Sequence, residues 1–279
     1  MKEVGYYNGN IGPLAEVTCP ILDRAVYFGD GCYDATMFRN GKIFAADMHI
    51  NRFFNSARLL KIDLGFTKDE LFAELMKVAD AYDGDEGLLY WQASRGSSPR
   101  SHAFPKNAKA NLMAFLTPHT FAPKTKELNC ITVEDKRFLY CNVKTLNLLP
   151  NCLVTQECVE RGADEVVFVR DGYVTEMAHS NVSFLVDGTF TYHPMDDKIL
   201  PGIAMQKIIA ACKALGIPTE ARALSLVEVM NADEVISSMS SCFCARVNTI
   251  DGIPVGRRDD ATFRRIQDAV HEEFLNETK

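Results

Sequence analysis

The chain has 279 residues, and this length predicts one large domain or two domains of moderate size. Hydrophobic residues make up 47% of it and charged residues 24%, a balance that excludes a disordered or fibrous protein. Asp and Glu number 37 against 30 Lys and Arg, and the resulting net charge of −7 leads us to expect no nucleic-acid partner.

The first 117 residues are predicted to form a small α/β domain. The run Gly41–Ala46 indicates a strand that leads into a helix capped by Asp47. Thr67 and Glu70 have the spacing of a capping box at the start of a second helix. The buried faces of the two helices should consist of Ile50, Phe53, Ala57 and Leu60, and of Leu71, Leu75, Val78 and Ala79. Two further segments have the apolar pattern of strands: Leu88–Ser94 and Leu112–Leu116.

Residues 118–127 contain two prolines and two lysines and are predicted to be a linker, followed by a larger domain at 128–279. Asp-Gly pairs between apolar runs predict hairpin turns at 171–172, 187–188 and 251–252. Helices are expected at Pro150–Arg161, at Ile203–Leu215, and in a last segment that carries Phe263, Ile266, Val270 and Phe274. Hairpins and crossovers together favour a barrel-like α/β domain over a doubly wound sheet, so the expected fold class is mixed α/β.

The sequence also predicts a compartment and the state of the thiols. No apolar run approaches the ~20 residues that span a bilayer, and the N-terminal segment MKEVGYYNGN does not have the pattern of a signal peptide. We therefore expect a cytoplasmic protein with no membrane partner. Nine cysteines are scattered along the chain and none forms a C-x-x-C pair, so we expect reduced thiols and no metal site.

Two charged residues lie where catalysis could use them. Lys144 stands in a Leu-rich segment just before a predicted helix, and a neutral lysine amine attacks carbonyl carbons to form a Schiff base. Glu176 ends a predicted buried strand, where a carboxylate can hold the proton of a pyridinium ring, as pyridoxal phosphate enzymes require. Taken alone, each residue is more simply explained as an ordinary surface charge.

Three other segments have groups that bind anions. The segment ILPGIAMQ (199–206) opens a helix after a proline, and free N–H groups at such a position bind phosphate. The segment ISSMSSC (236–242) supplies hydroxyl groups for the same purpose. In the loop 95–105, Arg100 and His102 alternate around one serine, so an extended segment directs both toward one side, where they suit a carboxylate. An unliganded helix start, a polar strand end and a solvated loop are the alternatives.

These segments together form a series of motifs that covers most of the chain. The motifs are FGDGCYD (28–34), HINR (49–52), RGSSPRSHAFP (95–105), KTLNLLPN (144–151), ERGADEVVFVRDGYVTE with SN (160–181), ILPGI (199–203) and DEVISSMSS (233–241). In kind and order they resemble those of fold-type IV pyridoxal phosphate aminotransferases, and most of all the D-amino acid aminotransferases. The resemblance implies a small N-terminal α/β domain, a larger C-terminal pseudo-barrel, pyridoxal 5′-phosphate as cofactor, and a homodimer.

The resemblance assigns roles to residues of the cofactor site. Lys144 resembles the Schiff-base lysine, and Glu176 resembles the partner of the pyridine nitrogen. Arg52 resembles the phosphate-binding arginine, and His49, three residues earlier on the same helical face, is expected to support the site. The other implied contacts are those of Ile203, Ala204 and Ser240 with the phosphate and of Leu200 with the cofactor ring.

The resemblance also implies how substrates bind. Tyr33 would hold the substrate α-carboxylate together with Arg100 and His102, the latter two reaching over from the other subunit. The sequence departs from the family pattern at three places near the site: Ala204 in place of a frequent threonine, Met239, and the run Met177–His179. These departures bear on side-chain specificity more than on the reaction.

The implied activity is transamination of D-amino acids, of the D-alanine or D-glutamate type, with an α-keto acid in a ping-pong Schiff-base mechanism. A branched-chain L-amino acid aminotransferase and an aminodeoxychorismate lyase share the cofactor machinery and are the alternatives. Arg100 and His102 favour the D-specific enzyme, because by resemblance this pair belongs to that group. A cofactor-binding protein without turnover is disfavoured, since the lysine, the glutamate and the carboxylate-binding pair occur together.

Overall fold

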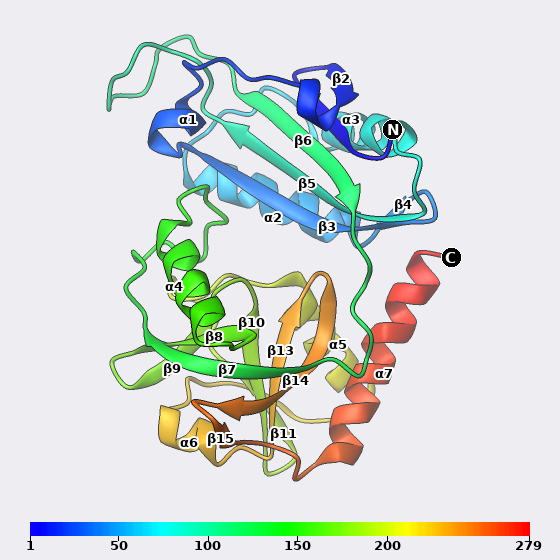
Figure 1. Cartoon of the computed structure of the whole chain (residues 1–279), viewed down its shortest axis with the longest axis vertical. Helices are drawn as coiled ribbons and strands as arrows, with labels where there is room; N and C mark the ends of the chain where they lie inside the picture. Colours follow the sequence, from blue (N-terminus) through cyan, green and yellow to red (C-terminus); the bar gives the residue numbers. More distant parts are fainter. The chain divides into compact units, whose positions relative to one another are not determined.

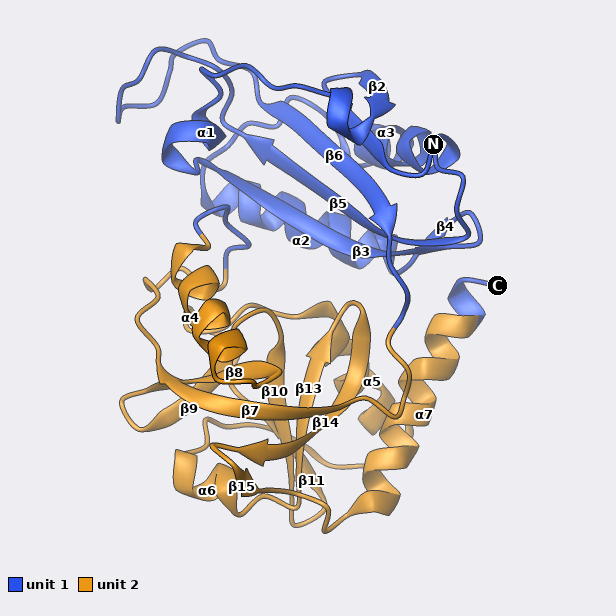
Figure 2. Cartoon of the chain, viewed as in Figure 1, with its two compact units in different colours: residues 1–121, 143–147, 276–279 blue, residues 122–142, 148–275 orange.

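The computed structural model describes all residues from 1 to 279, and the chain divides into two compact units (Figure 2). Unit 1 comprises residues 1–121, 143–147 and 276–279, and unit 2 comprises residues 122–142 and 148–275. The chain passes from unit 1 to unit 2 within the segment expected to be a linker. Residues 143–147 and 276–279, which we expected in the larger domain, belong instead to unit 1.

Unit 1 is built on a six-stranded antiparallel sheet with the order β2-β1-β6-β5-β3-β4 (Figure 1). Its elements are β1 (Val4–Tyr7), β2 (Asn10–Pro13), the 3-10 helix Leu14–Glu16, α1 (Arg24–Phe28), β3 (Gly31–Arg39), β4 (Lys42–Ile43), α2 (Ala46–Leu59), α3 (Lys68–Asp80), β5 (Glu86–Ser94) and β6 (Asn111–Pro118). Helices α2 and α3 pack against this sheet around Trp91, Phe53 and Leu71, all fully buried. Burial of each such side chain contributes roughly 1.5–3 kcal/mol.

The starts of the two longer helices of unit 1 differ in how well the sequence predicts them. The capping box of α3 is confirmed, because Thr67 Oγ1 accepts from Glu70 N at 3.2 Å while Glu70 Oε2 accepts from Thr67 N at 2.7 Å. The predicted Asp47 cap of α2 is wrong, since the helix begins at Ala46 after Ala45, which has a left-handed conformation. Asp47 lies in the first turn instead, where its negative charge interacts favourably with the helix dipole.

Unit 2 contains one mixed sheet with the order β12-β11-β10-β13-β14-β7-β8-β9, with β15 paired to β14. Its elements are β7 (Glu127–Glu134), α4 (Leu149–Glu160), β8 (Glu165–Arg170), β9 (Tyr173–Met177), β10 (Asn181–Val186), β11 (Thr189–Tyr192), α5 (Ile203–Ala214), β12 (Thr219–Ala221), α6 (Leu226–Met230), β13 (Glu234–Met239), β14 (Cys242–Ile250), β15 (Ile253–Pro254) and α7 (Asp260–Glu277), whose end belongs to unit 1. The edge strand β9 continues into the central strand β10 through a turn closed by Met177 N donating to Ser180 O at 2.9 Å. The six strands from β10 to β9 therefore curl into a ring, which confirms a barrel-like mixed α/β fold.

The three Asp-Gly turns are confirmed as hairpins. In each turn both residues have positive φ angles, 47–52° for Asp and 72–83° for Gly, as a type I′ turn requires. They join β8 to β9, β10 to β11, and β14 to β15. The apolar residues predicted for the last helix are all buried in α7.

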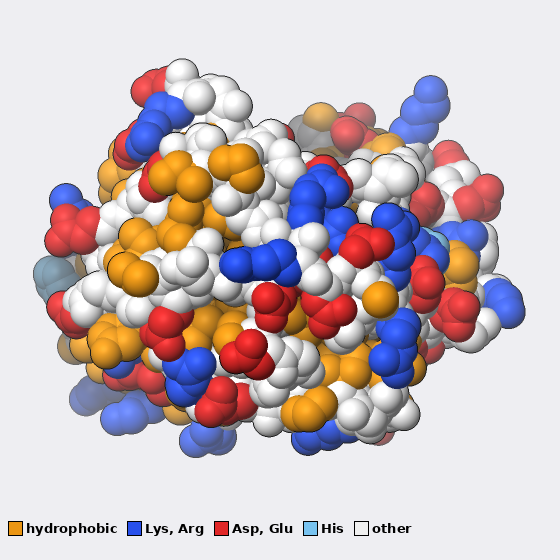
Figure 3. Space-filling view, turned by 90° about the horizontal axis from the view of Figure 1, so that it is seen from below, with side chains coloured by type: hydrophobic (Ala, Val, Ile, Leu, Met, Phe, Trp, Pro, Cys, Tyr) orange, Lys and Arg blue, Asp and Glu red, His pale blue; other side chains and the backbone are white.

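Charged side chains of both signs are interspersed on the face drawn in Figure 3, with hydrophobic side chains between them. This face therefore presents no continuous basic surface. None of the helices is both long and apolar enough to cross a membrane.

Candidate active site

The segment 143–147 places Lys144 against β3 in unit 1. An isolated β-bridge joins this segment to the strand. The Lys144 carbonyl accepts a hydrogen bond from Tyr33 N at 2.9 Å, and the Lys144 N–H donates to Ser56 Oγ at 3.2 Å. The backbone of the lysine is thus fixed on both sides by unit 1, although the chain before and after the segment belongs to unit 2.

Tyr33 brings an aromatic ring beside the Lys144 amine. The Nζ atom of Lys144 lies 4.4 Å from the centroid of the Tyr33 ring, within the range of a cation–π contact. The Tyr33 ring stacks on Tyr90 at 5.2 Å, and Tyr90 stacks on Phe115 at 4.6 Å. The stack of three rings restricts the orientation of Tyr33. Two residues that the sequence assigns to cofactor and substrate therefore lie together.

The fully buried carboxylate of Asp34, next to Tyr33 on β3, holds both Arg52 and His49. Arg52 Nε and Nη2 donate to the two Asp34 oxygens at 2.9 and 2.7 Å, and His49 Nδ1 lies 2.8 Å from Oδ1. Burial would raise the pKa of Asp34, but Arg52 and His49 outweigh it and hold that pKa well below its usual range. Burial lowers the pKa of His49. Arg52 is thereby oriented by an ionised carboxylate, and His49 contacts the same group.

The loop between β5 and β6 carries Arg100 and His102, both exposed. The two side chains meet at Phe28 of α1. The Arg100 Cζ atom lies 4.9 Å from the centroid of the Phe28 ring, and the His102 ring lies 5.1 Å from it. The loop thus brings a guanidinium and an imidazole together, as their alternate spacing in the sequence indicates.

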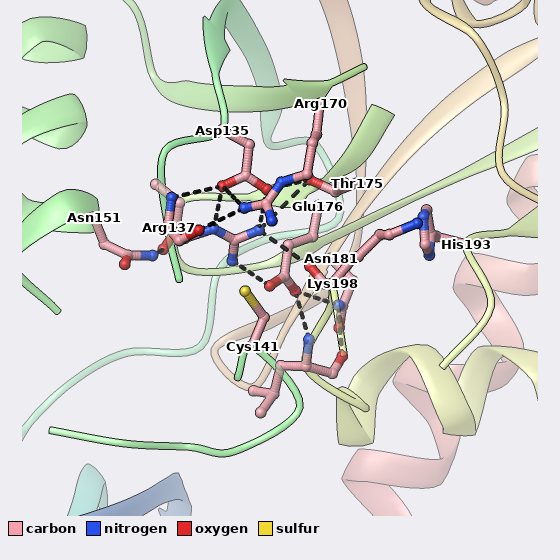
Figure 4. Close-up of polar contacts among 12 residues, drawn as sticks. Asp135, Arg137, Cys141, Asn151, Arg170, Thr175, Glu176, Asn181, His193 and Lys198 are labelled. Carbon is pink, nitrogen blue, oxygen red and sulfur yellow. Dashed lines mark hydrogen bonds and ion pairs between the residues drawn. The ribbon is translucent and has the colours of Figure 1, made fainter. Parts of the chain in front are cut away.

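In unit 2, Glu176 is a buried carboxylate with hydrogen-bond donors at both oxygens (Figure 4). Arg137 Nη1 donates to Oε1. Asn181 Nδ2 and the Leu200 N–H donate to Oε2 at 2.9 and 3.1 Å. Donors of this kind favour the ionised form of a carboxylate. Glu176 is therefore held as an oriented anion at the end of β9.

Arg137 is fixed in turn by Asp135. Its Nε and Nη2 donate to the two Asp135 oxygens, each at 2.9 Å, and Arg170 Nη2 lies 3.0 Å from Oδ1. Burial would lower the pKa of Arg137, but the hydrogen bonds that it donates to Asp135 and the charge of Glu176 raise it. The Cζ atom of Arg137 lies 4.3 Å from the centroid of the Phe168 ring. Figure 4 shows the result, a continuous network of alternating charges that ends at Glu176.

The start of α5 lies beside this network. Ile203 and Ala204 form the first turn and are buried, and no side chain caps the helix. A Cβ atom on Gly202 would lie 1.8 Å from Asn181 Oδ1, so only glycine fits at this position. The first N–H groups of α5 have no partner within the helix, which is the arrangement that binds anions.

Ser240 lies in the tight turn between β13 and β14. Because Ser238 on β13 is opposite Asn181 on β10, this turn is at the end of the sheet where β9 and β10 join. His179 lies at the same end, and its Nδ1 atom is 3.0 Å from the buried carboxylate of Glu165. Leu200 also lies at this end of the sheet, because its N–H donates a hydrogen bond to Glu176.

The predicted site residues therefore form two groups. Unit 1 contains Tyr33, His49, Arg52, Arg100, His102 and Lys144, and unit 2 contains Glu176, Leu200, Ile203, Ala204 and Ser240. Sequence reasoning missed three residues that hold these groups in place, namely Asp34, Arg137 and Asn181. The sequence signal for Asp34 was its position directly after Tyr33. The signal for Arg137 was its spacing of two residues from Asp135, but such a spacing is also typical of a pair of surface charges.

The fold is shared by solved structures of aminotransferases. The Escherichia coli branched-chain amino acid aminotransferase superposes with a TM-score of 0.89 at 22% identity, covering 100% of this chain and 96% of that chain. The branched-chain aminotransferase of Thermoproteus uzoniensis has the same TM-score at 20% identity, covering 99% and 96%. At this level of identity the similarity concerns the fold alone.

The sequence identifies the family. Residues 31–250 match the family model of amino-transferase class IV, and the chain belongs to this family of aminotransferases. It is similar to the D-alanine aminotransferase of Bacillus licheniformis, with 34% identity over 275 residues that cover 98% of this chain and 97% of the relative. It is 37% identical to the D-alanine aminotransferase of Staphylococcus haemolyticus over 257 residues, which cover 90% of each protein.

Proposed function

We propose that the protein catalyses pyridoxal 5′-phosphate-dependent transamination between D-amino acids, of the D-alanine or D-glutamate type, and α-keto acids. The observation that carries this proposal is the similarity, over nearly the whole chain, to several bacterial proteins named D-alanine aminotransferase. The branched-chain aminotransferases share the fold at 20–22% identity and do not bear on the substrate.

Residues of each unit fit the proposed cofactor. In unit 1, the Lys144 amine lies beside an aromatic ring on a fixed backbone. In unit 2, Glu176 presents an oriented anion, and Gly202 leaves the start of α5 without a Cβ. When bound, the cofactor supplies an electron sink for the electrons released from the substrate Cα–H bond. Lys144 would hold its aldehyde carbon, and Glu176 its ring nitrogen.

The remaining contacts follow from charge and position. Arg52, oriented by Asp34, would bind the phosphate together with the N–H groups of Ile203 and Ala204. The Ser240 hydroxyl would add a hydrogen bond to the same group. Leu200, whose N–H is bonded to Glu176, would pack against the ring.

The protein residues then move and hold protons. The Lys144 amine would take the proton from the substrate Cα as a base and later return a proton as an acid. Glu176 would hold the proton of the ring nitrogen, and Arg137 balances the charge of Glu176. The overall exchange would convert an amino acid into its α-keto acid in one half of a ping-pong cycle and a second α-keto acid into an amino acid in the other half.

We propose that the protein recognises its substrate by the α-carboxylate. Arg100 and His102 provide donors on one loop, and Tyr33 adds a hydroxyl. We further propose a cytoplasmic homodimer in which this loop serves the site of the partner subunit.

A comparison of D- and L-amino acids as substrates tests the proposed function. The purified protein, loaded with pyridoxal 5′-phosphate, is supplied with D- or L-alanine, glutamate or leucine together with 2-oxoglutarate or pyruvate, and the α-keto acid product is measured. We expect kcat/KM for D-alanine or D-glutamate to exceed that of the L-enantiomer by about 100-fold or more. A preference for L-leucine would establish the branched-chain activity instead, and release of pyruvate from aminodeoxychorismate would establish the lyase.

A further inference from the structure

We propose that Arg24 is a positioning residue that sets the place of Arg100 and His102, and with it the affinity for the substrate carboxylate. This inference rests on the proposed function, because it concerns the group that those two residues bind. Arg24 begins helix α1, which the sequence reasoning did not consider.

The base of the loop is tied to α1 by main-chain and side-chain hydrogen bonds. Arg24 N donates to Gly96 O at 3.0 Å, Ser98 N donates to Leu22 O at 3.1 Å, and the Tyr27 hydroxyl donates to Ser98 O at 2.7 Å. These contacts fix the loop only as far as residue 98. Arg100 and His102 lie beyond them.

The Arg24 side chain provides the next contact along the loop. It is only 3% exposed, and its Nη1 atom donates to Ser101 O at 2.7 Å. Ser101 stands between Arg100 and His102, so this hydrogen bond restrains the backbone that carries both side chains. A buried guanidinium that donates to the carbonyl of an exposed loop residue is well suited to position that residue.

Arg24 is itself fixed by Asp30, which immediately precedes β3. Arg24 Nε donates to Asp30 Oδ2 at 2.7 Å. Burial would raise the pKa of Asp30, but the hydrogen bonds from Arg95 and Arg24 outweigh it and lower that pKa. Because Asp30 lies three residues before Tyr33, Arg24 connects the strand that carries Tyr33 to the backbone of Ser101.

Arg95 shares Asp30 but cannot replace Arg24. Its Nε and Nη2 atoms bind the carboxylate at 2.9 Å, and its remaining donors reach Leu60 O at 2.8 Å and Lys61 O at 2.7 Å. Arg95 therefore holds Asp30 in place and has no hydrogen bond to the loop backbone between Arg100 and His102. Loss of Arg24 should release Ser101 while leaving Asp30 paired.

The ring of Phe28 completes the arrangement. Arg24 Cζ lies 4.8 Å from its centroid and Arg100 Cζ lies 4.9 Å from it, while the His102 ring lies 5.1 Å away. Cations attract the faces of aromatic rings at these distances. The same ring thus contacts the proposed positioning residue and both carboxylate-binding residues.

The test compares Arg24→Lys and Arg24→Gln with the wild-type holoenzyme. A lysine ammonium keeps the charge but cannot bind Asp30 and Ser101 O with the fixed fork of a guanidinium. We expect KM for D-alanine to rise by about tenfold while kcat stays within about twofold, because the loss is in carboxylate binding. The inhibition constant for propionate, a carboxylate without an amine, should rise by the same factor. Arg58→Lys, at an exposed arginine of α2, serves as the matched control and should change neither value.

Three outcomes would overturn the proposal. An unchanged KM and an unchanged propionate inhibition constant would show that Arg24 does not position the loop. A fall in kcat or in the absorbance of the bound cofactor as large as the rise in KM would show a general structural role. Failure of both variants to fold would show the same. If the wild-type protein itself did not transaminate D-alanine, the proposed function would fail, whereas the dissociation constant of propionate, measured from the change in absorbance of the bound cofactor, would still test Arg24.

Discussion

Removing the charge of the Asp34 carboxylate should lower the folding stability of unit 1. This carboxylate is completely buried and accepts four hydrogen bonds, two from Arg52, one from His49 and one from the Ala35 N–H. The substitution Asp34→Asn keeps the size of the side chain but removes its charge. The Arg52 guanidinium, with a side-chain exposure of 7%, would then be left without this counter-charge.

The expected loss of folding free energy follows from the burial of this ion pair. Removing one partner of a buried ion pair costs about 3–5 kcal/mol of folding free energy, since the remaining charge stays desolvated. The four hydrogen bonds share one desolvation cost, so their separate contributions do not add to this figure. The pKa of Asp34 is depressed in the folded protein, so its contribution is fully present above an unfolded pKa of ~3.9 and is lost as the pH falls toward the folded value. The difference between wild type and variant should therefore be complete at pH 7 and shrink below about pH 4.

The assay uses the single tryptophan of the chain. Trp91 is fully buried in unit 1, and its ring lies 6.4 Å from that of His49, so its fluorescence reports on the unfolding of this unit. Urea titrations of the cofactor-free protein give the free energy of unfolding of wild type and variant. The control is Asp83→Asn, at an ion pair on the surface of the same unit, which should cost less than about 1 kcal/mol. A loss for Asp34→Asn no larger than that of the control would refute the argument.

The remaining predictions concern the catalytic groups. Borohydride treatment of the holoenzyme should attach the cofactor to the peptide that contains Lys144, and Lys144→Ala should abolish transamination; a mass-spectrometric adduct on another lysine contradicts this. Glu176→Gln should retain the cofactor but lower kcat, because a neutral amide does not stabilise a protonated pyridine; an unchanged kcat would exclude this role. Inactive Lys144→Ala and Arg100→Ala dimers should regain activity after exchanging subunits, since a loop that acts in the partner's site leaves one site of each hybrid intact. A mixture that demonstrably exchanges subunits and stays inactive would exclude the shared site.

Local sequence signals predicted elements well where the determinants are close in the chain. The capping box of α3 and the Asp-Gly hairpins depend on residues no more than a few positions apart. The start of α2 was mispredicted because Asp47 satisfies the rule for a capping residue, whereas the backbone turns one residue earlier through the left-handed conformation of Ala45. A short β4 that ends at Ile43 leaves no room for the longer predicted strand.

The residues that hold the candidate site residues in place were harder to predict from the sequence. Asp34 and Arg52 are 18 residues apart, and Arg137 and Glu176 are 39 apart, so no local pattern connects either pair. The placement of residues 143–147 in unit 1 depends on pairing with β3 across more than 100 residues. The assignment of such a segment to a unit other than that of the flanking residues depends on tertiary contacts.

Substrate class depends on a few side chains of this protein, because the fold does not distinguish the alternatives. Branched-chain aminotransferases share the backbone with TM-scores of 0.89 at 20–22% identity, while the D-alanine aminotransferases are more similar in sequence. A fold that hosts several related activities assigns none of them by itself. In unit 1 the loop backbone between Arg100 and His102 accepts a hydrogen bond from the guanidinium of Arg24, which is itself bonded to Asp30. We expect a single substitution there to move Arg100 and His102, the proposed carboxylate-binding pair, without altering the sheet. Variants of Arg24 and Arg100 therefore examine the proposed substrate class more directly than the architecture does.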